Sequence, residues 1–334
     1  MKKSILTFIM AIAAVVAVQA QQISVVSPQG ATTLFTDLNI AIREAAPGSI
    51  VYLSGGAFQI SDTTKITKKL TIIGTGYRTD NGNVDGHTLV TGKINFMKGA
   101  DNSTLMGIYL TGDLNIADAS GSVNTLLVRY CNLYRVSVGN AECHEVLINQ
   151  NYIRLGPSIG GGSPIRFENN ILHSIFNING GIISNNVVLH ATTFNFSRPS
   201  AIGSFSSSRV ANNLFFAEVS PDVGLQHGNN TFFNNYFLPS SAALAAQIDG
   251  LIIENIEEFI VGPNNGVSTT SNFHLKNGSP GKNAGTDGTD IGIYGGTGFN
   301  DLALPPIPRI VAKRIAEQTD EQGNLKVQVK VKAE

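Results

Sequence analysis

The residues that could do chemistry in this 334-residue sequence are basic, and several recur along the middle of the chain. Arginine presents a planar fork that binds a carboxylate or sulfate through two hydrogen bonds. The spacing predicts one exterior ridge that either binds an anionic polysaccharide or supplies the base of a lyase; scattered, solvated side chains are the alternative. The candidate residues of this ridge are Arg135, Arg154, His173, Arg166 and His190, the last displaced by one position.

The elements that must position this ridge repeat along the chain. The segments RYCNLYR, NQNYIR, FENNILH, ISNNVVLH, VANNLFF and FNNYFL align six asparagines at intervals of 19, 19, 16, 27 and 22 residues. Such intervals are typical of β-solenoid coils with insertions at the turns, and they are too irregular for an α-helical repeat array. The aligned residues are Asn132, Asn151, Asn170, Asn186, Asn213 and Asn235.

Each aligned asparagine ends a short strand-like run and precedes apolar or aromatic residues. Stacked coils would let each amide donate to one neighbour and accept from the other, so a buried polar column stays hydrogen-bonded. The preceding position is also rich in amides, and Asn tolerates the left-handed backbone of a sharp turn. The pattern therefore predicts a structural Asn ladder rather than catalytic residues.

Both ends of the repeat region have their own signals. Residues 36–46 carry apolar residues at helical spacing with Thr36 as a candidate N-cap, and residues 49–53 and 70–73 read as short strands. A helix in this place would cap the open end of a solenoid. After a Pro-rich linker, residues 309–315 and 325–332 predict a hairpin, which we expect to dock on the solenoid rather than on a partner.

The Asn-Asn turns, residues 70–76 (LTIIGTG) and residues 279–296 (SPGKNAGTDGTDIGIYGG) resemble proteins of the pectate-lyase-like superfamily. The last stretch is similar to the final coil of secreted β-helix proteins from Bacteroidetes. The resemblance implies an all-β fold: a right-handed parallel β-helix over residues 21–302, with a short N-terminal capping helix and an extended or hairpin tail over residues 303–334. It does not imply one activity, because the superfamily includes lyases, hydrolases, isomerases and adhesins.

The enzymes of that superfamily imply particular side chains. Its lyases hold Ca²⁺ with clustered carboxylates and use Arg or Lys as a base, and its hydrolases need close Asp residues. Here no Asp lies between Ala119 and Pro221. We therefore expect a polysaccharide-binding, surface or adhesion protein without cofactor or metal. The alternative is a polysaccharide lyase, which alone would call for Ca²⁺.

Composition and the N-terminus predict where such a protein works. Charged residues make up only 14% of the chain and the net charge is −1, which gives no attraction to nucleic acid and suits a glycan partner. Lys2, Lys3 and the apolar run that follows predict a signal peptide over residues 1–20. We expect export to the periplasm, outer surface or extracellular space, no transmembrane segment after cleavage, and a monomer. Cys131 and Cys143 could form a disulfide or remain free thiols.

Overall fold

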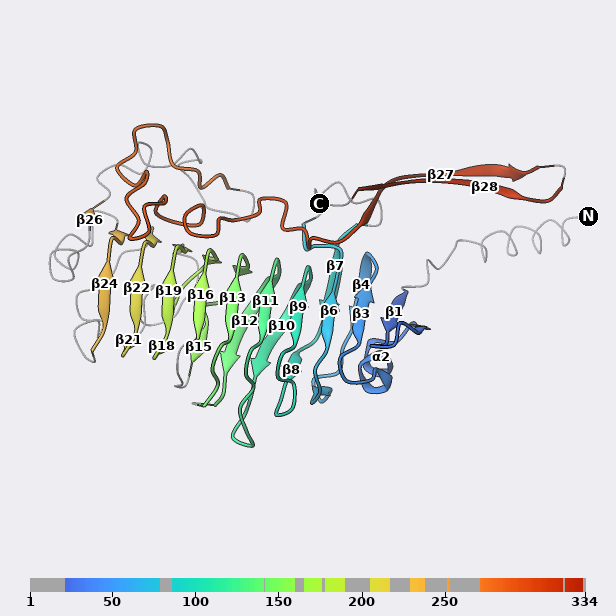
Figure 1. Ribbon diagram of the computed structural model, residues 1–334, viewed down its shortest axis with the longest axis horizontal. Helices are drawn as coiled ribbons and strands as arrows, with labels where there is room; N and C mark the ends of the chain where they lie inside the picture. The colour runs from blue at the N-terminus through green and yellow to red at the C-terminus, as the bar shows by residue number, and fades with distance from the viewer. Residues whose placement is uncertain are drawn as a thin grey trace, which may run out of the picture.

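The computed structural model describes residues 22–78, 86–140, 142–159, 165–175, 178–189, 205–216, 229–237, 251–252, 271–320 and 322–332. The predicted signal peptide lies outside these ranges. Within them the chain winds into a parallel β-helix, as the sequence predicts, with its coils stacked along one axis (Figure 1). No helix among the described residues is long and apolar enough to cross a membrane.

One long side of the solenoid is an eleven-stranded sheet, here called sheet A. Its strands are parallel except at the N-terminal end, where β1 pairs antiparallel with both β2 and β3. In spatial order its strands are β2 (Thr32–Phe35), β1 (Ile23–Val26), β3 (Ile50–Leu53), β6 (Thr71–Ile73), β9 (Thr104–Met106), β11 (Leu127–Arg129), β13 (Leu147–Asn149), β16 (Arg166–Glu168), β19 (Ile182–Ser184), β22 (Arg209–Ala211) and β24 (Thr231–Phe233).

The opposite side is a thirteen-stranded sheet, here called sheet B. Its main row is β26 (Leu251–Ile252), β25 (Tyr236–Phe237), β23 (Leu214–Phe215), β20 (Val187–Val188), β17 (Ile171–Leu172), β14 (Tyr152–Ile153), β12 (Asn132–Val138), β10 (Tyr109–Ile116), β7 (Thr88–Thr91) and β4 (Gly56–Gln59). A register shift lies between β10 and β12, whose second halves pair with shorter strands. There β10 pairs with β8 (Ile94–Phe96) and β12 with β15 (Ser158–Ile159), while β5 (Lys65–Ile66) pairs with β8. Beyond them β18 (Ile178–Asn179) pairs with β21 (Phe205–Ser206).

The interior of the solenoid is a stack of apolar side chains. In sheet A the central residues of successive strands lie in register and are fully buried. Because side chains alternate between the two faces of a strand, the residues on either side of each central one point outward. The column consists of Val128, Ile148, Phe167, Ile183 and Val210.

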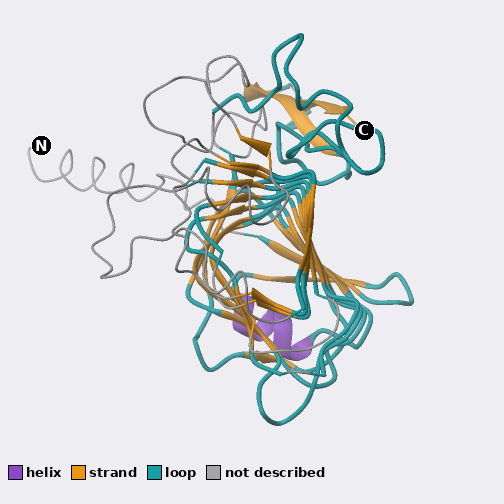
Figure 2. Ribbon diagram, turned by 90° about the vertical axis from the view of Figure 1, so that its left-hand side faces the viewer, coloured by secondary structure: helices purple, strands orange, loops and turns teal. Residues whose placement is uncertain are grey.

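The helix α2 (Leu38–Glu44) covers the N-terminal end of this core (Figures 1 and 2). It buries Leu38, Ala41 and Ile42 against the first coils. Its N-cap is Asp37 and not Thr36, because the Asp37 carboxylate accepts hydrogen bonds from the amides of Asn39 and Ile40, at 2.7 and 3.0 Å. The hydrogen bond from Ile40 is the main reason that the pKa of Asp37 lies below its usual value.

Five asparagines form the predicted ladder at the corner between sheet A and sheet B. The side-chain amide of each of the first four donates to the Oδ1 atom of the asparagine in the next coil at 2.9–3.1 Å, and the backbone N–H donates to the same oxygen. All five are almost completely buried. The column leaves few polar atoms unpaired in the interior. Its members are Asn151, Asn170, Asn186, Asn213 and Asn235.

The sixth aligned residue, Asn132, is not part of the ladder. Asn132 pairs with Tyr152 in the sheet register, and the corner position opposite Asn151 is occupied by Cys131. The alignment was wrong by one residue because this coil has twenty residues and not nineteen. Cys131 therefore lies in the corner turn, its N–H donates to Oδ1 of Asn151, and both cysteines are free and buried.

A second column of amides stands one residue before the ladder and has another role. Its members adopt left-handed backbone angles, with φ between 47° and 58°, which Asn tolerates better than most residues. Their side chains bind residues 271–308, here called the strap, which runs back over the corner toward the N-terminus (Figure 1). The column consists of Gln150, Asn169, Asn185, Asn212 and Asn234.

The strap corrects the expectation that residues 279–296 form a last coil. Successive parts of it contact successive coils in reverse order, from Ala284 at Asn234 to Asn300 at Gln150. It ends on Gly107, where a Cβ atom would stand 2.3 Å from Cγ of Pro305, so only glycine lets the strap approach.

The strap also completes a second apolar core on the outer face of sheet B. Phe273, Leu275, Ile291 and Ile293 of the strap are buried there. They cover outward-facing residues of the sheet, namely Ile171, Val187, Leu214 and Tyr236. This contact explains why β17, β20 and β23 are apolar on both faces.

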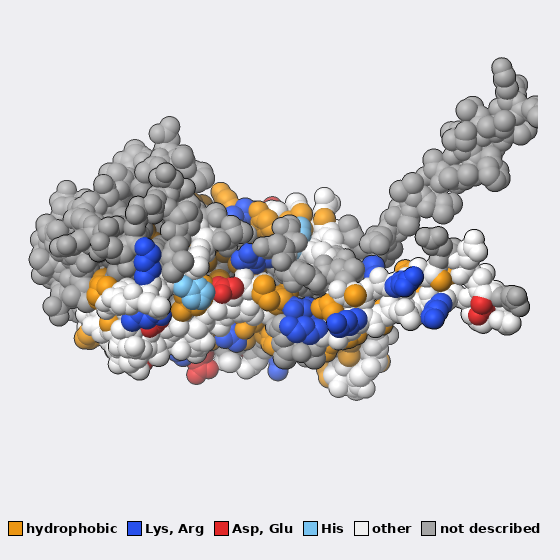
Figure 3. Space-filling view, turned by 90° about the horizontal axis from the view of Figure 1, so that it is seen from above, with side chains coloured by type: hydrophobic (Ala, Val, Ile, Leu, Met, Phe, Trp, Pro, Cys, Tyr) orange, Lys and Arg blue, Asp and Glu red, His pale blue; other side chains and the backbone are white. Residues whose placement is uncertain are grey.

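Beyond the strap, β27 (Arg309–Thr319) and β28 (Leu325–Lys332) form the predicted antiparallel hairpin. The expectation that it docks on the solenoid is wrong: the hairpin projects past the N-terminal end of the body (Figure 1), and every residue of β28 is exposed. Apolar Val327, Val329 and Val331 are each more than half exposed. Lysine and arginine side chains line the hairpin (Figure 3).

Candidate functional site

The predicted basic ridge is divided between two sides of the solenoid. Arg135 and Arg154 come from sheet B, whereas Arg166 opens β16 in sheet A. His173 follows β17 on the sheet B side, and His190 lies outside the described residues. The one-residue shift that excludes Asn132 from the ladder also affects Arg135. The backbone N–H of Arg154 bonds to Leu133, so Arg154 and Arg135 do not occupy equivalent positions in their coils. The structure therefore does not bring these residues together as one row.

Arg135 and Arg154 each have partners within sheet B. Arg135 donates two hydrogen bonds to the Asp113 carboxylate, at 3.0 and 2.8 Å, and these bonds raise the pKa of Arg135. A guanidinium held in this way is a poor base. The guanidinium of Arg154 lies over the rings of Tyr109 and Tyr134, and its Nη2 donates to a backbone carbonyl at 2.8 Å. Both arginines stabilise the outer face of sheet B.

Arg166 lies instead in a groove of about 440 Å³ between sheet A and the strap. The floor of the groove is the outer face of three successive strands, β16, β19 and β22, whose carboxyl ends face the strap in Figure 1. The strap, which lies over the corner and is hydrogen-bonded to its amides, borders this floor. The residues that line it are Arg166, Glu168, Asn169, Ile182, Ser184, Asn185, Arg209, Ala211, Asn212, Thr286, Asp287, Gly296 and Thr297.

The floor of this groove consists of two rows in register. The first row places Ile182 between Arg166 and Arg209, and the second places Ser184 between Glu168 and Ala211. Neighbouring strands are roughly 4.8 Å apart, so each row repeats at that distance along the solenoid axis. The groove thus offers apolar contact next to donors and acceptors, coil after coil.

The charges in the groove are paired or held by neighbours. Arg166 and Glu168 form an ion pair at 2.6 Å, in which the arginine side chain is 50% exposed and the glutamate 13%. Arg209 lies over the ring of Phe233, which is 42% exposed, at 4.9 Å. Burial raises the pKa of Asp287, but hydrogen bonds from the hydroxyl and amide of Thr289 outweigh that effect, so its pKa lies below the usual value.

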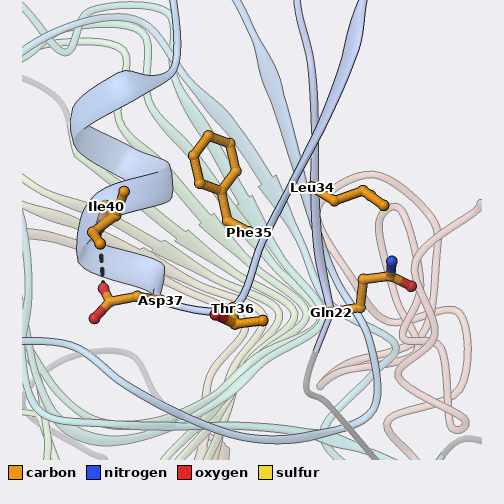
Figure 4. Close-up of a pocket in the computed structure, with 6 residues that line it drawn as sticks. All are labelled: Gln22, Leu34, Phe35, Thr36, Asp37 and Ile40. Atoms are coloured by element: carbon orange, nitrogen blue, oxygen red, sulfur yellow. Dashed lines mark hydrogen bonds between the residues drawn. The ribbon is translucent and has the colours of Figure 1, made fainter.

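The other hollows on the described surface are less suited to a ligand. One lies between β2 and α2 at the N-terminal end, where Leu34 and Ile40 are exposed beside the N-cap Asp37 (Figure 4). Another, of about 640 Å³, lies among loops that contain Lys98, Asp101 and Glu142. The loop hollow has no regular sheet as its floor, and the N-terminal hollow has one charged side chain.

The described residues contain no cluster of three or more His, Cys, Asp or Glu side chains that could hold a metal ion. Asp287 and Asp290, an oxygen-rich pair in the sequence, hold the turns of the strap. Asp290 accepts hydrogen bonds from Lys282 at 2.8 Å and from the amide of Asn283 at 3.0 Å. The oxygen-rich residues 80–85 lie outside the described ranges.

Sequence reasoning found Arg166 but not the groove around it. Thr286, Asp287 and Thr297 are far from β16 along the chain, and they reach the groove only because the strap returns along the corner. The amide-rich position before each ladder asparagine was the one signal that could have indicated a bound segment. Comparisons with family models, curated proteins and solved structures gave no match for this chain. The superfamily suggested by the Asn-Asn turns stays a prediction.

Proposed function

We propose that this protein is an exported polysaccharide-binding protein of the cell envelope or extracellular space, and that the groove between sheet A and the strap is its binding site. The observation that carries this proposal is the repetition of the groove floor over three coils. A polysaccharide is itself a repeat, so a floor whose strands repeat along one axis offers side chains at a regular spacing to successive sugars.

The chemistry of the lining supports the same ligand. Ile182 presents apolar surface to the C–H faces of a sugar, and Ser184 and Arg166 lie beside it as hydrogen-bonding groups. Small-ligand sites commonly combine apolar contact with a few polar groups in this way. Phe233, exposed at the end of the row, adds an aromatic ring on which a sugar can stack.

The catalytic alternative has less support in the described residues. A lyase would need a basic side chain that can lose its proton and carboxylates that hold Ca²⁺. Arg135 is held in its protonated form by Asp113, and Arg166 is paired with Glu168. These basic side chains therefore support binding better than proton abstraction.

Binding to a panel of soluble polysaccharides, measured by calorimetry with the chain from Gln21 onward, tests the proposal. We expect Arg166→Ala and Ile182→Lys to weaken binding about tenfold, because both residues form the centre of the floor. Arg43→Ala is the matched control: Arg43 is an exposed arginine with a glutamate partner at 2.9 Å, on α2. Failure to bind any polysaccharide, unchanged binding by the groove variants, or release of unsaturated products would each contradict the proposal.

A further inference from the structure

Resting on the proposed function, we infer that the groove selects an uncharged polysaccharide over an acidic or sulfated one. A basic ridge that included Arg166 was one prediction from the sequence, and such a ridge would bind an anionic polysaccharide. The groove contains two arginines, Arg166 and Arg209, and also two carboxylates, Glu168 and Asp287. The formal charge of its lining is therefore zero.

Arg166, to which an anionic sugar would bind, is already paired with Glu168. Both Nε and Nη2 of Arg166 lie within 2.8 Å of one Glu168 oxygen. A uronate or sulfate would have to displace this carboxylate and then remain next to it, in a site only partly exposed to water. Like charges in such a place repel one another appreciably.

The strap adds a second carboxylate to the wall. Asp287 is kept ionised by the Thr289 hydroxyl and amide, which hydrogen bond to its Oδ1 at 2.7 and 3.0 Å. It lines the same groove as Glu168. A polyanion that followed the axis would thus meet two negative groups, whereas a sugar hydroxyl can donate to the same oxygens.

An uncharged polysaccharide meets complementary groups along the whole groove. Its hydroxyls can donate to Glu168 and Asp287 and accept from Arg166, while Ile182 contacts its C–H surface. A neutral chain does not have to break an existing ion pair or hydrogen bond before it binds, so its binding free energy carries a smaller penalty. The inferred ligand is a neutral, hydroxyl-rich glycan that lies along the solenoid axis across β16, β19 and β22.

Matched oligosaccharides test this inference. A neutral galactan, a galacturonan and a sulfated galactan of equal length are titrated into the full exported chain at low and high ionic strength. We expect the neutral chain to bind at least about tenfold more tightly than either polyanion, with little change on adding salt. Tighter binding of a polyanion would overturn the inference and leave polysaccharide binding intact; no binding of any of the three or of the wider panel would overturn the proposed function itself.

Two charge variants give an independent test on the same ligands. Glu168→Gln and Asp287→Asn keep the size of each side chain and remove its charge, and we expect each to strengthen galacturonan binding about threefold. Glu44→Gln, which removes the partner of Arg43 on α2, is the matched control and should change nothing. If neither groove variant strengthens galacturonan binding, the carboxylates do not set selectivity and the inference is wrong.

Discussion

At the scale of single residues, the corner between the two sheets holds a cysteine in one coil where the later coils have an asparagine. The ladder runs from Asn235 to Asn151 and then meets Cys131. The thiol lies against the two carbonyl oxygens, of Leu105 and Arg129, that correspond to those bound by the amide of Asn151 one coil later. Burial raises the pKa of this thiol to about 12, so it stays neutral.

This geometry predicts that Cys131→Asn extends the ladder by one coil. The new amide would have Leu105, Arg129 and Oδ1 of Asn151 as acceptors, so we expect the free energy of unfolding to rise by about 1 kcal/mol. Urea denaturation followed by circular dichroism measures the change. Cys143→Asn is the control, because this second buried thiol lies outside the ladder and an amide there should destabilise the protein. A loss of stability in both variants would show that the corner at Cys131 cannot take an amide.

At the scale of elements, the strap covers apolar residues on the outer face of sheet B. Sheet B presents apolar residues on its outer face as well as its inner face, and such a sheet needs a cover. The strap supplies it with side chains spaced to meet successive coils, and the left-handed amides supply the hydrogen bonds. The same contacts build one wall of the groove, so the cover and the binding site depend on each other.

The strap therefore contributes to global stability and not only to the groove. Ile293 is 1% exposed between the strap and sheet B, and we expect Ile293→Ala to lower the free energy of unfolding by about 3 kcal/mol. Ile40→Ala is the control, since Ile40 is 39% exposed on α2 and its loss should cost under about 1 kcal/mol. Thermal unfolding of both variants measures the two losses of stability. If Ile293→Ala and Ile40→Ala lowered the stability equally, the strap would be only loosely attached to sheet B.

At the scale of the whole molecule, the solenoid and the projecting hairpin are joined where the strap ends and β27 begins. Thr75, Pro305 and Ile310 line a hollow of about 200 Å³ at this junction. Further out, the hairpin carries an exposed row of valines on one face and basic residues on the other. A two-stranded hairpin of this kind adds little stability of its own.

We expect a chain that ends at Ile310 to keep the unfolding temperature of the full chain and its polysaccharide affinity, because the body, strap and groove are complete without the projecting strands. Differential scanning calorimetry and calorimetric titration check the two quantities. A large drop in the unfolding temperature would show that the hairpin returns to the body in solution.

Local patterns in the sequence determined the solenoid and its ladder. Asn next to apolar residues at coil-length intervals, short strands ended by glycine, and an amphipathic segment near the N-terminus all act within one or two coils. Their physical causes, namely side-chain alternation, amide stacking and left-handed turns, therefore appear directly in the order of residues. The exact register did not, because one extra residue in the coil of Cys131 shifts the equivalences of that coil, and an alignment of short motifs does not reveal such a shift.

Only the tertiary structure decided where the strap, the hairpin and the arginines lie. Residues 279–296 resemble a final coil, and the course of the strap back along the corner depends on contacts with residues 150 or more positions away, as between Gln150 and Asn300. The groove arises from that long return, since its floor and its wall come from distant parts of the chain. The inferred charge selectivity depends on the pairing of Arg166 with Glu168 and on Asp287 in the groove, and the order of residues alone does not show which side chains pair in space.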